Sequence, residues 1–186
     1  PFVRGMVRNA LALGWRVGFT AGGDDHTGQW GTEARIGEAY YKQGLMSIAA
    51  RDCTRAALFE ALYERRVVAT TGARMLLRYE VNSRPMGSEI SCGADPALRD
   101  CRRLAISCHG TGPLARIDVI RNNAVVHSVP GNGSPDLSTV WEDREPLETL
   151  WLPPAAFCAH PFAFYYVRAL QEDGEVAWAS PVWVDP

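Results

Sequence analysis

Val67-Val68-Ala69-Thr70-Thr71-Gly72-Ala73-Arg74 is the stretch at which the hydrophobic pattern of this chain changes. Before it, a helical pattern over Arg55–Arg66 alternates with short runs of β-type residues, of which Val67–Thr71 is the last. After it, the period is mostly two, and one short strand pattern follows another. The change predicts a boundary near Gly72, between an α/β region over residues 1–72 and an all-β region over residues 73–186.

The α/β region contains two clear helical patterns. Phe2–Leu13 repeats apolar residues at near-helical spacing, and Gly14 follows it as a C-terminal glycine does. Thr54 is a suitable N-cap for the second helix. Between the two, Gly44–Ala50 predicts a strand, and a short helix is predicted around Glu33–Tyr41.

The all-β region predicts short strands at the spacing typical of an immunoglobulin-like antiparallel β-sandwich. Asn122-Asn123 is a turn dipeptide between two of these strands. Tryptophans 141, 151, 178 and 183 are expected in the sandwich core or over its edges. The predicted strands cover residues 74–82, 89–92, 103–109, 115–121, 124–129, 139–142, 148–152, 163–171 and 176–184.

Composition and charge exclude several function classes. The chain has 186 residues, 47% of them hydrophobic and 22% charged, with a formal net charge of -2. Such a balance is ordinary for a globular protein and gives no cationic surface for nucleic acid. Arg65-Arg66 and Arg102-Arg103 are interpreted as solvated ends of a helix and a strand. No apolar run reaches the length of a membrane span.

The five cysteines form no Cys-x-x-Cys motif, so a structural zinc site is not expected. Cys92 and Cys101 flank a turn-rich segment, and a disulfide between them is reasonable if the flanking strands pair. The alternative is two ordinary thiols. The sequence leaves both open.

Gly22-Gly23-Asp24-Asp25-His26-Thr27-Gly28 places two carboxylates and an imidazole between glycines, after the β-type run Trp15–Ala21. In an extended backbone Asp24 and His26 project to the same side and approach one ion, while Asp25 points away. Zinc, manganese and iron accept such a mixed donor pair. The alternative is an ordinary turn, because Asp and Gly are common loop residues.

Residues 27–43 are predicted to form a loop beside this motif, and Arg35 and Lys42 are its candidate contacts to a substrate phosphate. Single basic residues on a loop are also commonly just solvated. His109, His127 and His160 have no acidic or histidine neighbour at short ligand spacing. These three histidines are expected to be structural or exposed.

The segment Gly22–His26 resembles the last metal-ligand motif of the PHP (polymerase and histidinol phosphatase) family, with Gly23 in place of a serine. Thr54–Arg74, Met86–Glu89 and Ala177–Val184 resemble segments of a little-characterised bacterial branch of that family, which carries a β domain after its barrel. The resemblance implies that residues 1–72 are the C-terminal part of a distorted β/α barrel. The expected fold is thus a barrel remnant followed by a β-sandwich.

The resemblance also implies a function, namely that of a metal-dependent phosphoesterase acting on a small phosphorylated substrate. Asp24 and His26 would be metal ligands and Asp25 a residue that orients a ligand or a water. The family's other ligands come from strands that precede this motif, so the chain is expected to be a fragment that is inactive alone, whose site is empty of metal. A truncated barrel should expose Val17, Phe19 and Met46, which predicts a homo-oligomer unless they pack on the sandwich.

The alternative function is non-enzymatic. In it the β-sandwich recognises a carbohydrate or a partner protein, and the support is the aromatic-rich C-terminal strand region. The compartment is left open between cytoplasmic and exported.

Overall fold

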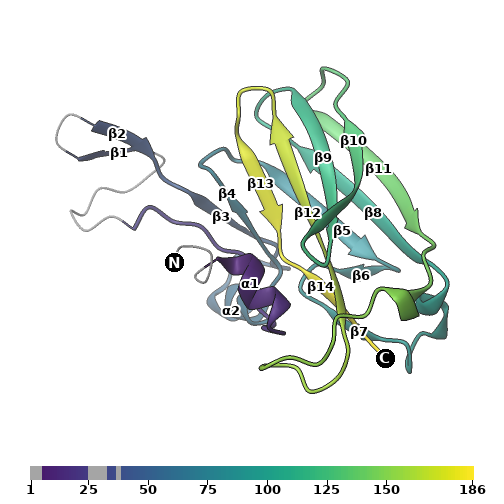
Figure 1. The fold of residues 1–186 in the computed structure, drawn as a ribbon. Helices are drawn as coiled ribbons and strands as arrows, with labels where there is room; N and C mark the ends of the chain where they lie inside the picture. Colours follow the sequence, from purple (N-terminus) through teal and green to yellow (C-terminus); the bar gives the residue numbers. More distant parts are fainter. Residues whose placement is uncertain (1–5, 25–32, 37–38) are drawn as a thin grey trace.

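The computed structural model describes residues 6–24, 33–36 and 39–186 (Figure 1). Strands are the main regular element of the described chain, and helices are few and short. Its elements are α1 (Val7–Ala12), β1 (Glu33–Ile36), β2 (Ala39–Lys42), β3 (Leu45–Ile48), α2 (Arg55–Tyr63), β4 (Val67–Thr70), β5 (Leu76–Val81), β6 (Arg84–Pro85), β7 (Glu89–Ser91), β8 (Arg102–His109), β9 (Leu114–Arg121), β10 (Ala124–Pro130), β11 (Asp136–Asp143), β12 (Ala163–Gln171), β13 (Val176–Ala179) and β14 (Val182–Asp185), with 3-10 turns at Pro96–Arg99 and Leu147–Thr149.

Two sheets pack face to face (Figure 1). The large sheet has the order β10-β9-β12-β13-β4-β3, and β14 joins it beside β12 and carries β7 on its other side. The small sheet has the order β11-β8-β5-β6. Among the described strands of these two sheets, every pairing is antiparallel except that of β14 with β7. The β-rich, sandwich-like part of the expected fold is therefore confirmed.

The main core lies between the sheets. Strands β5, β8 and β11 of the small sheet alternate more buried and more exposed side chains, whereas β4 and β12 of the large sheet are buried on both faces. Leu77, Tyr79 and Val81 of β5 point inward and contact the inner face of the large sheet, which includes Ile117 and Val119 of β9. Tyr79 also donates its hydroxyl to the carbonyls of residues 165 and 180 on the large sheet, at 2.8 and 2.9 Å. The two layers are thus joined by apolar packing and by buried hydrogen bonds.

Two details of the strand prediction are wrong. Residues 148–152 form no regular strand, because Leu147–Thr149 is a 3-10 turn and only Leu152 makes an isolated bridge. The strand predicted over residues 176–184 is two strands, β13 and β14. The break falls at Ser180-Pro181, where proline lacks the N–H that a ladder needs.

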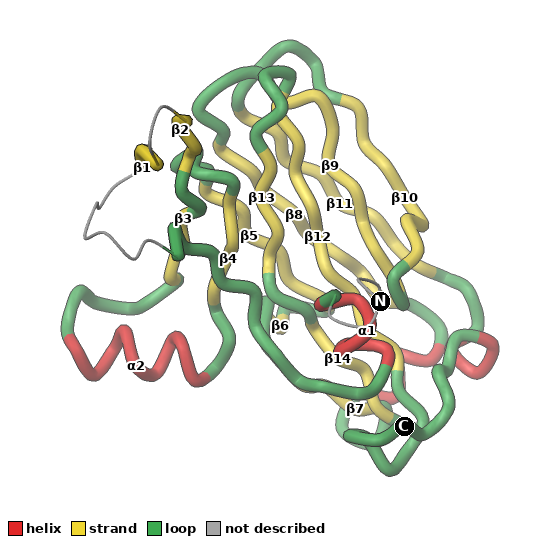
Figure 2. Tube along the Cα trace, turned by 60° about the vertical axis from the view of Figure 1, so that its left-hand side comes forward, coloured by secondary structure: helices red, strands yellow, loops and turns green. Residues whose placement is uncertain are grey.

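The segment β3-α2-β4 does not form part of a closed barrel in the described chain. Helix α2 begins as expected, with Thr54 Oγ1 accepting from the N–H of Ala57 at 3.3 Å. However, β3 and β4 pair antiparallel, and β4 pairs with β13, so the large sheet contains strands from both sides of Gly72. Figure 2 shows α2 at the ends of β3 and β4, to one side of the sandwich. The boundary near Gly72 stays a prediction.

The N-terminal segment follows a different course from the one expected. Gly14 ends α1 with a φ of 88°, as predicted for a C-terminal glycine. Trp15–Ala21 then forms no ladder with any described strand. Val17 and Phe19 pack against an aromatic cluster on the outer face of the large sheet, so these two residues are half-buried by the protein's own sandwich. Only Met46 of the three expected residues is exposed.

Residues Glu33–Lys42 do not form the expected short helix. Strands β1 and β2 pair antiparallel, with Glu33 opposite Lys42 and Ile36 opposite Ala39. The adjacent tyrosines 40 and 41 favour a strand, because aromatic side chains fit the pleated surface of a sheet. Local β-propensity therefore outweighs the weak helical spacing of this segment.

Arg102 is not a solvated strand end but a fully buried cation between the sheets. Its guanidinium lies 3.1 Å from Asp143 Oδ1 and donates to the carbonyls of residues 98, 99 and 145. Asp143 Oδ2 accepts from the Tyr165 hydroxyl at 2.6 Å and from Arg121 Nη1 at 2.7 Å. Such a buried charge is tolerated because each of its polar groups finds a partner.

All five cysteines are free thiols, so Cys92 and Cys101 are not bonded to each other. Cys92 is buried and Cys101 is half-buried, and the turn between them is closed by backbone hydrogen bonds instead. Burial raises the pKa of the Cys108 thiol to about 11. Cys92 and Cys101 are thus two ordinary thiols, which was the alternative to a disulfide.

The buried Asp143 predicts acid sensitivity. Burial opposes its charged form, but hydrogen bonds from Tyr165 and Arg121 outweigh that penalty and hold the pKa of Asp143 below its ordinary value of 3.8. A carboxyl with a lowered pKa in the folded state contributes stability that is complete above pH 3.8 and is lost as the pH falls through its folded-state pKa. Urea unfolding at a series of pH values should therefore give a higher free energy of unfolding for wild type than for Asp143→Asn. This difference should narrow as the pH falls below 3.8. An unchanged gap would contradict the prediction, and the exposed Asp100→Asn should show no such trend.

The turn at Gly87 predicts a strong backbone constraint. Gly87 has a φ of 89°, and an added Cβ would lie 2.1 Å from the Glu64 carbonyl oxygen at the end of α2. Gly87→Ala should lower the free energy of unfolding by about 3 kcal/mol, because backbone atoms have to move. Gly133→Ala is the matched control, since Gly133 has a φ of 83° with open space around it and should cost only about 1 kcal/mol. Equal losses in thermal unfolding would show that the contact with α2 is unimportant.

Candidate functional site

The first half of the predicted metal motif lies beside the start of β3. Asp24 is exposed and has a φ of 47°, in the left-handed region that Asp adopts more readily than most residues. The extended backbone assumed for the Asp24 and His26 pair is thus not present at Asp24. Asp25 and His26 lie outside the described residues.

Close packing surrounds Gly23 and the two glycines at the nearby strand ends, Gly44 and Gly72. A Cβ on Gly23 would lie 2.3 Å from Cδ of the buried Gln43, and a Cβ on Gly44 would lie 2.8 Å from Ala21. Gly72 has a φ of 118° and approaches the carbonyl of Gln43. The segment before Asp24 is therefore fitted to the region where β3 begins and β4 ends.

Lys42 is engaged in an internal ion pair. Its Nζ lies 2.7 Å from Glu175 Oε1, and Glu175 Oε2 accepts from Thr71 Oγ1 at 2.6 Å and from the Ala73 N–H at 3.2 Å. Burial opposes the charge of Glu175, but Lys42 and Thr71 outweigh it and lower the pKa of that carboxyl. The partner of Lys42 thus comes from the C-terminal part of the chain, which no local sequence pattern indicated. Arg35 belongs to β1, and its side chain lies outside the described part.

The described residues do not by themselves make a metal centre. Carboxylate and imidazole are suitable donors for zinc, manganese or iron. Among residues 6–24, 33–36 and 39–186, however, no group of three or more His, Cys, Asp or Glu side chains is placed to hold one ion. Asp24 therefore fits a metal site only as one member of a larger donor set.

The other histidines contact protein neighbours. His109 Nδ1 lies 2.8 Å from Asp136 Oδ1 on the surface, and His127 stacks on Trp141 with ring centroids 5.2 Å apart. His160 is exposed, and its ring lies 3.7 Å from Cys158 Sγ. The expectation of structural or exposed histidines agrees with these positions.

The tryptophans of the sandwich form no exposed platform in the described chain. Trp183 is fully buried, and tryptophans 141, 151 and 178 are half-buried against the two clusters of core residues. They therefore occupy the core and edge positions that were expected of them. The alternative of a carbohydrate- or protein-binding module stays a prediction.

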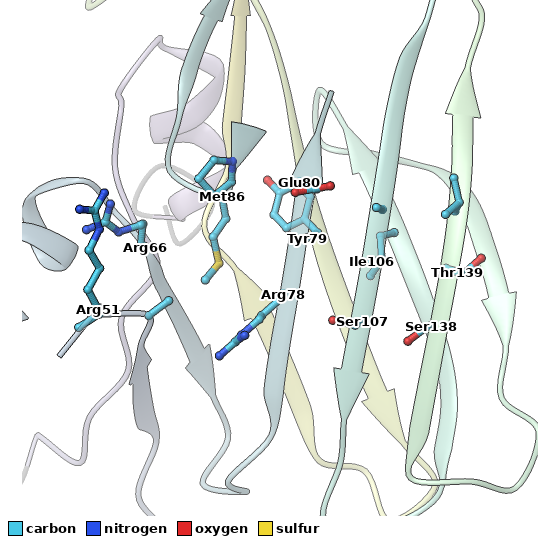
Figure 3. Close-up of a pocket in the computed structure, with 15 residues that line it drawn as sticks. Arg51, Arg66, Arg78, Tyr79, Glu80, Met86, Ile106, Ser107, Ser138 and Thr139 are labelled. Carbon is cyan, nitrogen blue, oxygen red and sulfur yellow. The ribbon is translucent and has the colours of Figure 1, made fainter. Parts of the chain in front are cut away.

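Sequence reasoning missed a groove of about 890 Å³ on the outer face of the small sheet. Its floor comes from β5, β8 and β11, and one wall comes from the connection that follows β3 (Figure 3). Three arginines line it, Arg51, Arg66 and Arg78, together with the carboxylate of Glu80. They are not neighbours in sequence, so no local motif indicates that they line one groove.

The packing around Gly23 predicts that a serine is disfavoured at this position. Gly23→Ser should lower the free energy of unfolding by about 1–2 kcal/mol, because the new side chain needs the space of Gln43. In a Gln43→Ala background the same serine should cost less, and a double-mutant cycle measures the difference. Strictly additive losses in chemical unfolding would contradict the predicted contact.

The comparisons with known proteins place these features among uncharacterised relatives. Residues 21–82, which include the Gly22–His26 motif, match a family described as "Protein of unknown function (DUF3604)". The chain is 36% identical over 181 residues to an uncharacterised protein of Chlamydia trachomatis and 38% identical over 182 residues to one of Chlamydia pneumoniae. These alignments cover 97% and 98% of this chain but only 29% of each relative.

No solved structure matches the chain. Within the described residues, no helix is both long and apolar enough to cross a membrane. The chain thus spans 29% of the length of the uncharacterised chlamydial proteins that it matches.

Proposed function

We propose that this chain is the C-terminal part of a PHP-like metal-dependent phosphoesterase, to which Asp24 and His26 contribute two ligands. The observation that carries the proposal is the position of Asp24, exposed at the end of a segment that forms no ladder with any described strand. Trp15–Ala21 would be a barrel strand whose neighbours belong to another part of the protein. In a β/α barrel, ligands lie where such a strand ends.

The strands β3 and β4 have another role in this proposal. Because they pair antiparallel and continue the large sheet, they join the barrel to the immunoglobulin-like sandwich and are not barrel strands themselves. Phe19 N donates to Ser180 Oγ at 2.9 Å, and Ser180 Oγ donates to the Val67 carbonyl at 2.7 Å. These contacts would fix the motif-bearing segment against the sandwich.

The length of the relatives is compatible with this division. The chain spans 29% of the chlamydial proteins that it matches, and the proposed remaining ligands belong to the rest of such a protein. A divalent metal bound by the complete ligand set would neutralise charge on a phosphoryl group and activate water. The chain's own contribution would be to hold Asp24 beside the start of β3, with His26 proposed as the second ligand and Asp25 proposed to orient one of them.

The structure changes the proposed role of one substrate contact. Lys42 is already paired with Glu175, so a substrate phosphate would have to compete with that carboxylate. Arg35 keeps its proposed role as a phosphate contact. The substrate itself is proposed only as a small phosphorylated molecule.

Metal analysis tests the proposal. A version extended upstream to the length of the chlamydial relatives should purify with stoichiometric zinc, manganese or iron, and Asp24→Ala with His26→Ala should lose most of it. The 186-residue chain should hold little metal and show negligible phosphoester hydrolysis. The matched control is Asp52→Ala with His109→Ala, which removes the same two side-chain types away from the motif. Absence of metal from the extended protein would overturn the proposal in favour of a non-enzymatic binding module.

A further inference from the structure

The groove on the outer face of the small sheet has a floor of short side chains. The register of the sheet places Arg78, Ser107 and Ser138 in one row across β5, β8 and β11, and Glu80, Ala105 and Val140 in the next. Alternation puts both rows on the face away from the core. Because serine and alanine are small, they leave room above the floor between longer side chains.

Arg51 and Arg66 line this groove from outside the small sheet. The backbone N–H of Ala49 donates to the Arg66 carbonyl at 2.9 Å, which fixes the chain leading to Arg51 beside Arg66. Both guanidinium groups lie near Glu60 of α2, whose pKa they lower, Arg66 most strongly through a hydrogen bond. Figure 3 shows Arg78 reaching from β5 toward the side of the groove that carries Arg51 and Arg66.

The charges in the groove are not balanced. Arg66 is paired with Glu60, at 2.8 Å between Nη2 and Oε1. Arg51 and Arg78 have no ion pair or side-chain hydrogen bond within the described part of the chain, and Glu80 is the one carboxylate among the described lining residues. Arg66 Nε is buried and has no hydrogen-bond partner there either. The groove therefore presents an excess of guanidinium donors.

We propose that this groove binds a small organic phosphate, such as a phosphorylated sugar, with Arg51 and Arg78 holding the phosphate and the hydroxyls of Ser107 and Ser138 contacting the polar body. Guanidinium groups bind phosphate through charge-assisted, often paired, hydrogen bonds. A volume of about 890 Å³ lies within the range of small-molecule sites. A dianionic phosphate matches two unpaired guanidinium groups better than a monoanionic carboxylate.

This site is separate from the proposed metal motif. Gly23 lies against Gln43, before β3, whereas Ala49 and Arg51 follow the end of that strand. The two features therefore occupy opposite ends of β3. Phosphate binding in the groove needs no metal, so its test is independent of the proposed phosphoesterase activity.

A titration of this protein with glucose 6-phosphate tests the inference. It is performed in low-salt buffer with EDTA and is monitored through the backbone amide chemical shifts in NMR. Saturable shifts are expected at Arg78, Ser107 and Ser138, and binding should weaken as salt is added. Arg51→Gln and Arg78→Gln should each weaken binding by about tenfold or more, because each removes a charge-assisted hydrogen bond. Both arginines are exposed, so folding should be retained.

The matched control is Arg84→Gln, which removes the same charge from an exposed arginine that does not line this groove. Its affinity should stay within about twofold of wild type. Equal weakening of binding by Arg84→Gln would show that the arginines act only through the overall charge of the protein, and it would overturn the site. Absence of saturable shifts, or equally tight binding of glucuronate, would overturn the assignment to phosphate.

Discussion

The pairing of β4 with β13 is the constraint on which the position of β3, α2 and β4 depends. It ties Val68 to Ala179 and Thr70 to Ala177, and so makes β3 and β4 an extension of the large sheet. Everything attached to these strands is positioned by that ladder, including α2, the segment before Asp24 and the arginines that follow β3. A chain that alternates helix and strand locally is thus incorporated into an antiparallel sheet.

A second set of interactions fixes the spacing of the two sheets. Arg102 and Asp143 of the small sheet meet Arg121 and Tyr165 of the large sheet in one buried network. Removing one charge from such a network leaves another buried without a partner, which costs several kcal/mol. The network therefore ties the small sheet, whose outer face forms the floor of the groove, to the large sheet.

The two proposed sites differ in what supports them. The Asp24 and His26 motif depends on a local pattern, and the described geometry supplies only the position of its first ligand. The arginine groove depends on geometry alone, because its members come from the connection after β3, from the residue before β4 and from β5. These three arginines line one groove only once the small sheet and the segment between β3 and β4 have come together.

The sequence by itself determined most local elements. Thr54 begins α2, Gly14 ends α1, and the left-handed Asn122-Asn123 turn joins β9 to β10, because caps and turns depend on a few neighbouring residues. Tertiary structure decided which sheet holds β4, that Arg102 is buried, that Lys42 pairs with Glu175, and that Arg51, Arg66 and Arg78 line one groove. These outcomes depend on contacts between residues far apart in the chain, whose partners a local pattern does not specify.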